Sequence, residues 1–224
     1  MKGMDEHRSR VFDELAVVGK AFGSARRLEL VELLAQGERS VDDLARAAGM
    51  GVTTVSAHLQ VLKASNLVST RREGTRIYYR LAGDDVAALY AAMRTVARER
   101  SADVARALDS YLNLPGGEVG VISRHELEER LQGGDLVLLD VRPAEEYAAG
   151  HIPGATSAPL EALGAMSASL RQGPPVVAYC RGTFCVLAHD AVRLLAVEGI
   201  TARRLEDGML EWRTHGHPVE VGAA

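Results

Sequence analysis

The sequence predicts two domains: a mainly α-helical domain with one β-hairpin, followed by an α/β domain with a parallel sheet. The 224 residues are enough for two hydrophobic cores. In the first half, apolar residues recur at helical spacing, and two strand-like runs surround a turn. In the second half, near-continuous apolar strands alternate with helical segments, which is typical of a parallel sheet. We expect the domains at residues 1–112 and 121–222, joined by a linker at 113–120.

Composition and charge narrow the possible functions. The sequence has no apolar run long enough to span a membrane and no apolar signal region at its N-terminus, so a cytoplasmic location without a membrane partner is expected. The net charge of −4 is unevenly distributed, because residues 1–112 carry 17 Lys/Arg and 15 Asp/Glu, whereas residues 113–224 carry 9 and 15. Between residues 53 and 80, five basic residues are opposed only by Glu73, which indicates a face that binds a polyanion.

The helices of the first half are marked by caps and by apolar spacing. An apolar set over residues 28–34 is followed by Ser40, which we expect to cap a short helix with Asp43 in the capping-box position. Gly49 and Gly51 end that helix. The next helix turns three apolar residues inward, namely Val55, Leu59 and Leu62.

A hairpin and a long helix complete the first half. The strand-like runs 67–72 and 75–81 surround Glu73-Gly74, the expected hairpin tip. One helix is expected over about residues 84–110, and its apolar stripe has no partner segment nearby in the sequence. We therefore expect a homodimer in which this helix pairs with a second copy. The stripe consists of Val86, Leu89, Tyr90, Met93, Val96, Ala97, Val104 and Leu108.

Three helices followed by an Arg-rich hairpin predict a winged helix-turn-helix that binds double-stranded operator DNA. Short polar side chains at the start of the third helix would let it enter the major groove, and the arginines of the hairpin would neutralise phosphates. The alternative is a protein–protein module with a basic loop. The candidate DNA-binding residues are Thr53, Thr54, Ser56, His58, Gln60, Lys63, Arg71, Arg72 and Arg76.

The run from Thr53 to Val68, with its Val-Ser-x-His-Leu-x-x-Leu pattern and the hairpin that follows, resembles the ArsR/SmtB family of dimeric repressors. The resemblance covers about residues 10–110. The metal sensors of that family place cysteines where this chain has Val41-Asp42-Asp43-Leu44, or histidines along the last helix, where this chain has none between 84 and 112. We therefore expect neither a metal site nor a cofactor.

Both cysteines of the chain lie in one hexapeptide, Cys180-Arg181-Gly182-Thr183-Phe184-Cys185. The apolar run 176–179 precedes it and a helical pattern follows, so Cys180 is expected on a turn between a buried strand and a helix N-terminus. Backbone N–H groups and the helix dipole there favour the thiolate. The sequence therefore predicts one reactive sulfur site, with Cys180 as its nucleophile.

The run from Asp140 to Ala155 resembles a rhodanese-domain signature, and the run from Asp207 to Trp212 resembles the second, looser signature of that family. The resemblance implies that Cys180 takes a sulfane sulfur as a persulfide, from thiosulfate or from a low-molecular-weight persulfide, and passes it on. It also implies a supporting role for Asp140 and Arg142. The loop expected to surround the persulfide is formed by Arg181, Gly182, Thr183, Phe184 and Cys185.

Loop length argues against the main enzymatic alternative. Cysteine-dependent phosphatases use Cys-x5-Arg, and the corresponding position here is Val186. An inert thiol in a rhodanese fold is a further alternative. Two interpretations of Cys185 stay open, since it could pack as a small apolar side chain or act as a resolving thiol for Cys180.

The combined prediction is a homodimeric transcriptional repressor whose rhodanese-like domain senses or transfers reactive sulfur through Cys180. Two alternatives remain. One is a thiosulfate-type sulfurtransferase in which the winged helix serves localisation or dimerisation. The other is a repressor that responds to arsenic or an oxyanion through the Cys180/Cys185 loop.

Overall fold

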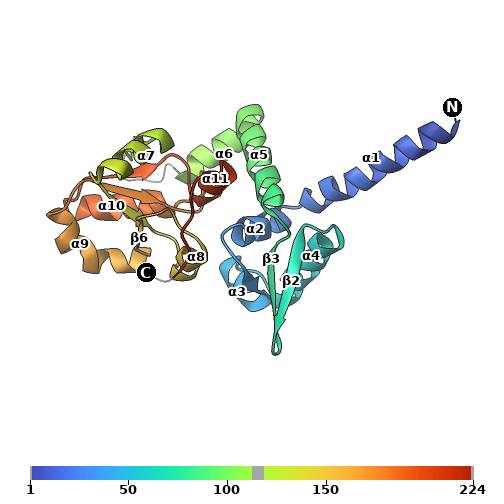
Figure 1. Ribbon diagram of the computed structural model, residues 1–224, viewed down its shortest axis with the longest axis horizontal. Helices are drawn as coiled ribbons and strands as arrows, with labels where there is room; N and C mark the ends of the chain where they lie inside the picture. Colours follow the sequence, from blue (N-terminus) through green and yellow to red (C-terminus); the bar gives the residue numbers. More distant parts are fainter. Residues whose placement is uncertain (1, 113–118, 223–224) are drawn as a thin grey trace. The chain divides into compact units, whose positions relative to one another are not determined.

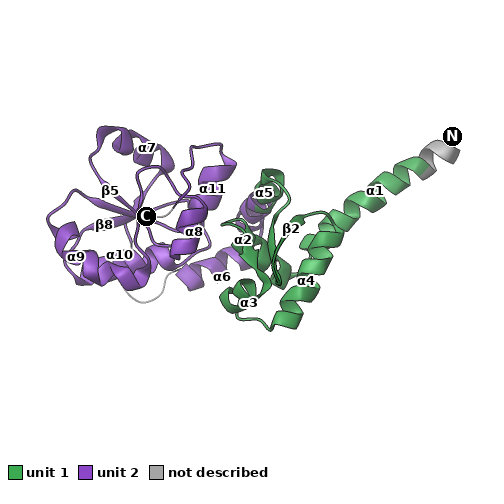
Figure 2. Ribbon diagram, turned by 60° about the horizontal axis from the view of Figure 1, so that its bottom comes forward, with its two compact units in different colours: residues 1–90 green, residues 91–224 purple. Residues whose placement is uncertain are grey.

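The computed structural model describes residues 2–112 and 119–222 and divides into two compact units, residues 1–90 and 91–224 (Figure 2). Residues 113–118, most of the expected linker, lie outside the described residues. The division also differs from the boundary expected at residue 112. Helix α5 (Asp84–Arg100) contributes to both units, and residues 101–112 group with the second unit.

The first unit combines helices with a small antiparallel sheet (Figure 1). The strand order is β1-β3-β2, so that the hairpin β2–β3 is extended by the short β1. This is the predicted winged helix-turn-helix arrangement. Its elements before α5 are α1 (Lys2–Phe22), α2 (Ala25–Leu34), β1 (Arg39–Ser40), α3 (Val41–Ala47), α4 (Val52–Ala64), β2 (Val68–Glu73) and β3 (Arg76–Leu81).

Local chemistry explains the boundaries of these elements. The Ser40 hydroxyl accepts a hydrogen bond from the Asp43 N–H at 3.2 Å, which confirms the predicted cap of α3. The predicted inward face of α4 is confirmed as well, because Val55, Leu59 and Leu62 are fully buried. At the hairpin, Glu73 pairs with Arg76, so the tip is Gly74-Thr75, one residue later than expected. Gly74 has φ +60°, which suits glycine at a tight turn.

The single helix expected over residues 84–110 is wrong, because the chain forms α5 and then α6 (Ala102–Leu112). Between them, the Ser101 hydroxyl accepts a hydrogen bond from the Val104 N–H at 3.3 Å and starts a new helix. The expected stripe is also divided. Val86 and Tyr90 are buried, whereas Leu89 and Val96 remain exposed.

The second unit contains a five-stranded sheet in the order β4-β8-β7-β5-β6, and all its strand pairs are parallel. This confirms the predicted α/β domain. Its elements are β4 (Val121–Ile122), α7 (Arg124–Gly133), β5 (Val137–Asp140), α8 (Ala144–Ala149), β6 (Thr156–Ser157), the 3₁₀ turn η1 (Leu160–Ala162), α9 (Leu163–Arg171), β7 (Val176–Tyr179), α10 (Leu187–Val197), β8 (Ala202–Leu205) and α11 (Met209–Thr214).

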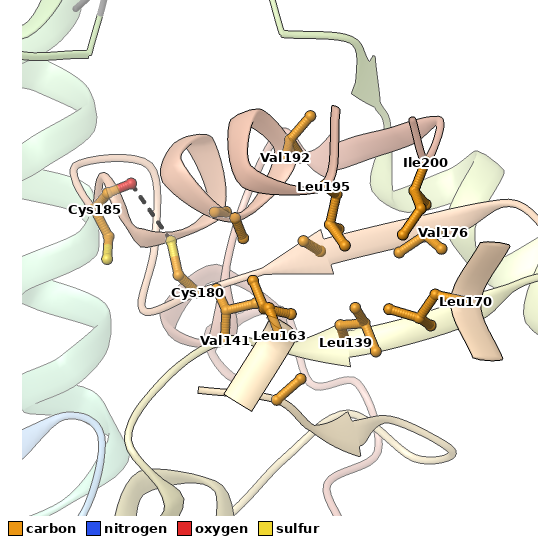
Figure 3. Packing of buried hydrophobic residues seen from close by; sticks show 14 residues of the cluster. Leu139, Val141, Leu163, Leu170, Val176, Cys180, Cys185, Val192, Leu195 and Ile200 are labelled. Atoms are coloured by element: carbon orange, nitrogen blue, oxygen red, sulfur yellow. Dashed lines mark hydrogen bonds between the residues drawn. The ribbon is translucent and has the colours of Figure 1, made fainter. Parts of the chain in front are cut away.

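Each face of this sheet has its own core, because successive side chains of a strand point to opposite faces. Val176 and Ala178 of β7 pack with α9 and α10 on one face, and Cys180 continues this alternation (Figure 3). Val177 and Tyr179 pack with α7, α8 and α11 on the other face. Among the described helices, none is long and apolar enough to cross a membrane.

Candidate functional site

Cys180 lies directly after β7, at the carboxyl end of the central strand of the sheet. Its side chain and that of Cys185 are buried, and both thiols are free. The Cys180 Sγ lies 3.4 Å from the Cys185 carbonyl oxygen, to which the thiol donates a hydrogen bond (Figure 3). In the described ranges, no three His, Cys, Asp or Glu side chains gather closely enough to hold a metal ion.

The start of α11 holds the backbone of the Cys180 loop, which we define as residues 180–186. The Met209 N–H donates to the Cys180 carbonyl at 2.9 Å, and the Leu210 N–H donates to the Arg181 carbonyl at 3.0 Å. Gly208 lies so close to the loop that a Cβ there would come within 2.3 Å of the Gly182 nitrogen. The second signature therefore acts by supplying a close backbone support for the cysteine loop.

The pKa values of the two neighbouring thiols differ from the expectation. Burial raises the pKa of the Cys180 thiol well above its ordinary value, and the nearby Cys185 side chain adds to this. The Cys180 side chain lowers the pKa of Cys185 to about 7, with help from the N–H groups of Leu187 and Arg181. The expected low pKa of Cys180 is therefore wrong for the unloaded protein, in which Cys185 ionises first.

The expected ring of loop N–H groups around the sulfur is only partly present. The Cys185 N–H donates to the Gly182 carbonyl at 3.0 Å, and the Thr183 N–H points to Glu211 Oε1 at 3.5 Å. The N–H groups that favour a Cys180 thiolate come from Gly182 and from Ala188 in the first turn of α10. The sulfur environment thus combines the loop with the helix that follows it.

Arg181 does not point to the sulfur site. Its guanidinium forms a two-pronged ion pair with the buried carboxylate of Glu146 on α8, with nitrogen–oxygen distances of 2.6 to 3.0 Å. Such a geometry is among the stronger charge-assisted contacts. The positive charge of Arg181 is therefore compensated by Glu146, and Arg181 anchors the loop to α8.

Asp140 and Arg142 form a fully buried ion pair at the end of β5, with an Nε–Oδ1 distance of 2.9 Å. The Tyr179 hydroxyl of β7 donates to Asp140 Oδ2 at 2.7 Å, and Arg142 Nη2 donates to the Gly150 carbonyl at 2.7 Å. The pair therefore joins the strand before Cys180 to the segment that carries the Gly-His-Ile-Pro motif. This geometry agrees with the supporting role that the resemblance implies.

Sequence reasoning missed several residues that surround the loop. Glu211 accepts hydrogen bonds from the Gly208 N–H and the Thr183 hydroxyl, both at 3.1 Å. Its position three residues after Gly208, at a helix start, is a signal that could have identified it. His189 on α10 is buried, and its pKa is lowered to about 4 by burial and by Arg204 and Arg193. No sequence pattern pointed to His189 or to Glu146.

The candidate DNA-binding residues of α4 lie on its outer faces. Thr53, Thr54 and Lys63 are exposed, and Ser56 and His58 are half-buried. Gln60 is exposed too, but its amide donates to the Tyr79 hydroxyl at 3.1 Å, so it also braces the helix against β3. The hydroxyl groups of Thr53 and Thr54, at the start of α4, are therefore accessible to a binding partner.

The wing arginines are not equivalent. Arg72 and Arg76 are exposed at the hairpin end. Arg71, by contrast, lies 2.7 Å from Glu38 and 2.6 Å from Glu73, and it stacks over Tyr78. These two carboxylates hold the pKa of Arg71 above its ordinary value. Its charge is therefore offset by two carboxylates, whereas Arg72 donates to the Gly74 carbonyl and Arg76 interacts with Tyr78.

Comparison with known proteins assigns both units. Residues 24–70 match the model of the bacterial regulatory proteins of the arsR family, and residues 123–215 match that of the rhodanese-like domain. The chain is 50% identical over its whole length to the HTH-type transcriptional regulator Rv0324 of Mycobacterium tuberculosis, covering 97% of that protein. It is 40% identical over 83 residues, 37% of this chain and 71% of the relative, to a biofilm growth-associated repressor of Agrobacterium fabrum.

Among solved structures, the chain is similar to the homodimeric winged helix-turn-helix DNA-binding domain of Mb0332 from Mycobacterium bovis. The two are 52% identical, with a TM-score of 0.41, and the match covers 43% of this chain and 89% of that fragment.

Proposed function

Because this chain belongs to the ArsR family of bacterial regulatory proteins and carries a rhodanese-like domain, we propose that it is a DNA-binding repressor controlled by reactive sulfur. It binds operator DNA as a homodimer and takes a sulfane sulfur as a persulfide on Cys180. The observation that carries the proposal is the pair of buried cysteines between the end of β7 and the start of α10, in which the Cys180 thiol donates to the Cys185 carbonyl. This pair contains both cysteines of the chain.

DNA recognition is proposed for the outer face of α4 and for the wing. Thr53 and Thr54 are exposed at the first turn of α4, where a helix reads base edges in the major groove. Arg72 and Arg76 would lie against phosphates, since their charges are not compensated as that of Arg71 is. This arrangement supports sequence-specific binding with a strong dependence on salt.

A second copy of the chain is the proposed partner. Helix α1 carries Val11, Phe12 and Leu15 with more than half of each side chain exposed, at 66%, 57% and 62%. Val96 of α5 is similarly exposed, at 58%. Several exposed apolar side chains close together on one helix, as on α1, are typical of an interaction surface. Burial in a homodimer would cover them and would present two copies of α4 to the two halves of an operator.

The chemistry follows from the unequal acidities of the thiols. The Cys180 Sγ attacks the outer sulfur of thiosulfate while its proton passes to the Cys185 thiolate; the sulfur–sulfur bond of thiosulfate breaks, and sulfite leaves with the bonding pair. The Cys185 thiol can then attack the Cys180 Sγ of the persulfide while its proton passes to the outer sulfur. The sulfur–sulfur bond of the persulfide breaks, the outer sulfur leaves as hydrosulfide, and a Cys180–Cys185 disulfide forms.

The test combines DNA binding with mass spectrometry on the full-length chain. A fluorescent duplex recovered by the protein from a random pool would be titrated before and after treatment with thiosulfate or a glutathione persulfide. We expect treatment to change the affinity of the wild type at least tenfold, a coupling of about 1.4 kcal/mol. Cys180→Ser should lose the response. In Cys185→Ser, the persulfide should form more slowly, because the proton acceptor is lost, and should then remain on Cys180, because the disulfide step is blocked.

Each alternative gives a different result. A donor response that persists in Cys180→Ser overturns the proposal. Steady sulfur turnover without sequence-specific DNA binding identifies a sulfurtransferase. A mass increase from one arsenic bridging Cys180 and Cys185 after arsenite treatment, with no sulfur adduct after any donor, identifies an arsenic-responsive repressor.

A further inference from the structure

Arg94 of α5 is buried beside the Cys180 loop, with only 5% of its surface exposed. Its guanidinium carbon lies 4.3 Å from the centre of the Phe184 ring, within the range of a cation–π contact. Its Nη2 lies 3.5 Å from Glu211 Oε1. A buried guanidinium is costly unless such partners compensate for lost water, so these contacts are strongly constrained in geometry.

Glu211 connects Arg94 to the loop backbone. The same carboxylate accepts hydrogen bonds from the Gly208 N–H and the Thr183 hydroxyl. Gly182 fits against both charged groups, since a Cβ there would lie 2.8 Å from Glu211 Oε2 and 3.0 Å from Arg94 Nη1. The loop, α11 and this part of α5 therefore meet at one closely packed point.

The contact between Arg94 and Phe184 is next to the thiol pair in the chain. Phe184 precedes Cys185, whose carbonyl oxygen accepts the Cys180 thiol hydrogen bond at 3.4 Å. A displacement of the Phe184 ring would therefore move the Cys185 backbone and change the distance between the two sulfurs. Arg94 touches neither sulfur and acts through Phe184 and Glu211.

We propose that Arg94 is a positioning residue for sulfur transfer at Cys180, fixing the loop through Phe184 and Glu211 so that Cys185 meets Cys180. This inference rests on the proposed function and deepens it. Helix α5 begins at Asp84, in the first unit, where Val86, Ala87 and Tyr90 are buried. The helix that follows the wing thus carries a side chain on which the sulfur site depends. Because such coupling is reciprocal, a change in the loop conformation on sulfur uptake would also change the packing of Arg94 on α5.

The first experiment measures the thiol pair without any sulfur donor. Thiolate absorbance in the ultraviolet would be followed against pH in the full-length chain, whose two cysteines are both in this loop. The wild type should show a first midpoint near pH 7, from Cys185. Arg94→Gln and Phe184→Leu should each raise that midpoint by about one pH unit, since both loosen the loop that holds the two thiols together. Arg94→Lys should restore part of the shift.

The second experiment measures the rate at which Cys180 takes up sulfur from thiosulfate. We expect Arg94→Gln to slow it by about tenfold or more, because small displacements of reacting groups are costly. Combining Arg94→Gln with Glu211→Gln should cost little beyond the single changes, since both residues act on the same loop. Arg100→Gln, at the exposed end of α5, is the matched control and should leave both measurements unchanged. Trp212 fluorescence would verify that each variant is folded.

The outcomes separate this inference from the proposed function. A folded Arg94→Gln with wild-type midpoint and uptake rate overturns the positioning role, even if Cys180 forms a persulfide. A midpoint that shifts in Arg94→Gln but not in Phe184→Leu shows a direct charge effect and also overturns it. If the wild type takes up no sulfur from any donor while both variants shift the midpoint, Arg94 positions the thiol pair, but the proposed function fails and its role in sulfur transfer is overturned.

Discussion

Two regions of the molecule differ in the exposure of their polar groups. One is the surface formed by the outer face of α4 and the wing, and the other is the Cys180 loop. On the first surface, Thr53, Thr54, Arg72 and Arg76 are exposed, and little of the fold depends on them. In the loop, both thiols are buried, and the carbonyls of Cys180 and Arg181 accept hydrogen bonds from the start of α11. A surface that recognises a polyanion needs accessible charge, whereas a site for covalent chemistry needs fixed distances. Substitutions should therefore change partner affinity on the first surface but structure and reactivity in the loop.

The largest effect is expected from Gly208→Ala. A Cβ at Gly208 would come within 2.3 Å of the Gly182 nitrogen and 2.6 Å of the Cys180 carbonyl oxygen, so that the loop must move off α11. We expect a loss of about 2 to 4 kcal/mol in the free energy of unfolding. Urea denaturation followed by the fluorescence of Trp212, the single tryptophan, measures it.

Gly164→Ala is the matched control for this change. A Cβ at Gly164 in α9 would meet nothing within 4 Å, so stability should be unchanged or slightly higher. Equal stability of the two variants would mean that Gly208 does not support the loop as closely as the structure shows.

A smaller effect concerns the pH dependence of stability. The pKa of His189 falls from 6.5 in the unfolded chain to about 4 in the folded one. Below pH 6.5 the unfolded chain takes up a proton that the folded chain rejects, so stability should fall as the pH drops toward 4. The loss is at most about 3 kcal/mol. Urea denaturation at pH 7, 5.5 and 4 should show a smaller loss in His189→Asn than in the wild type.

His125→Asn is the control for this prediction, because the His125 side chain on α7 is 83% exposed. Its pH dependence should match that of the wild type. If His189→Asn loses as much stability between pH 7 and pH 4 as the wild type, other groups cause the loss. Protonation of His189 then contributes less to the pH dependence than its burial indicates.

The smallest effects on stability, and the clearest on DNA binding, are expected in the wing. Arg72→Gln and Arg76→Gln should each reduce the slope of log affinity against log salt by about 1 and leave stability within about 0.5 kcal/mol. Arg71→Gln should change the slope less, because Glu38 and Glu73 already compensate that charge. Fluorescence anisotropy over a salt series measures these slopes. An Arg71 effect as large as the other two would show that its ion pairs open on DNA.

Most of the fold could be predicted from local patterns. The cap at Ser40, the inward face of α4 and the parallel strands around β7 depend on neighbouring residues and on apolar periodicity, which the chain carries in its order. The helix break at Ser101 was missed, because an apolar stripe that continues past a serine conceals a competing hydrogen bond to Val104.

The site was predicted less completely. The sequence by itself determined the two domains, the position of both thiols in one loop and the exposed polar start of α4. Only the tertiary structure decided which thiol has the lowered pKa, that the Arg181 guanidinium pairs with Glu146, and that Arg94 reaches the loop from α5. The reason is physical. Burial shifts the pKa of a thiol, and pairing determines where an arginine side chain points, and both depend on residues that are far apart in the chain.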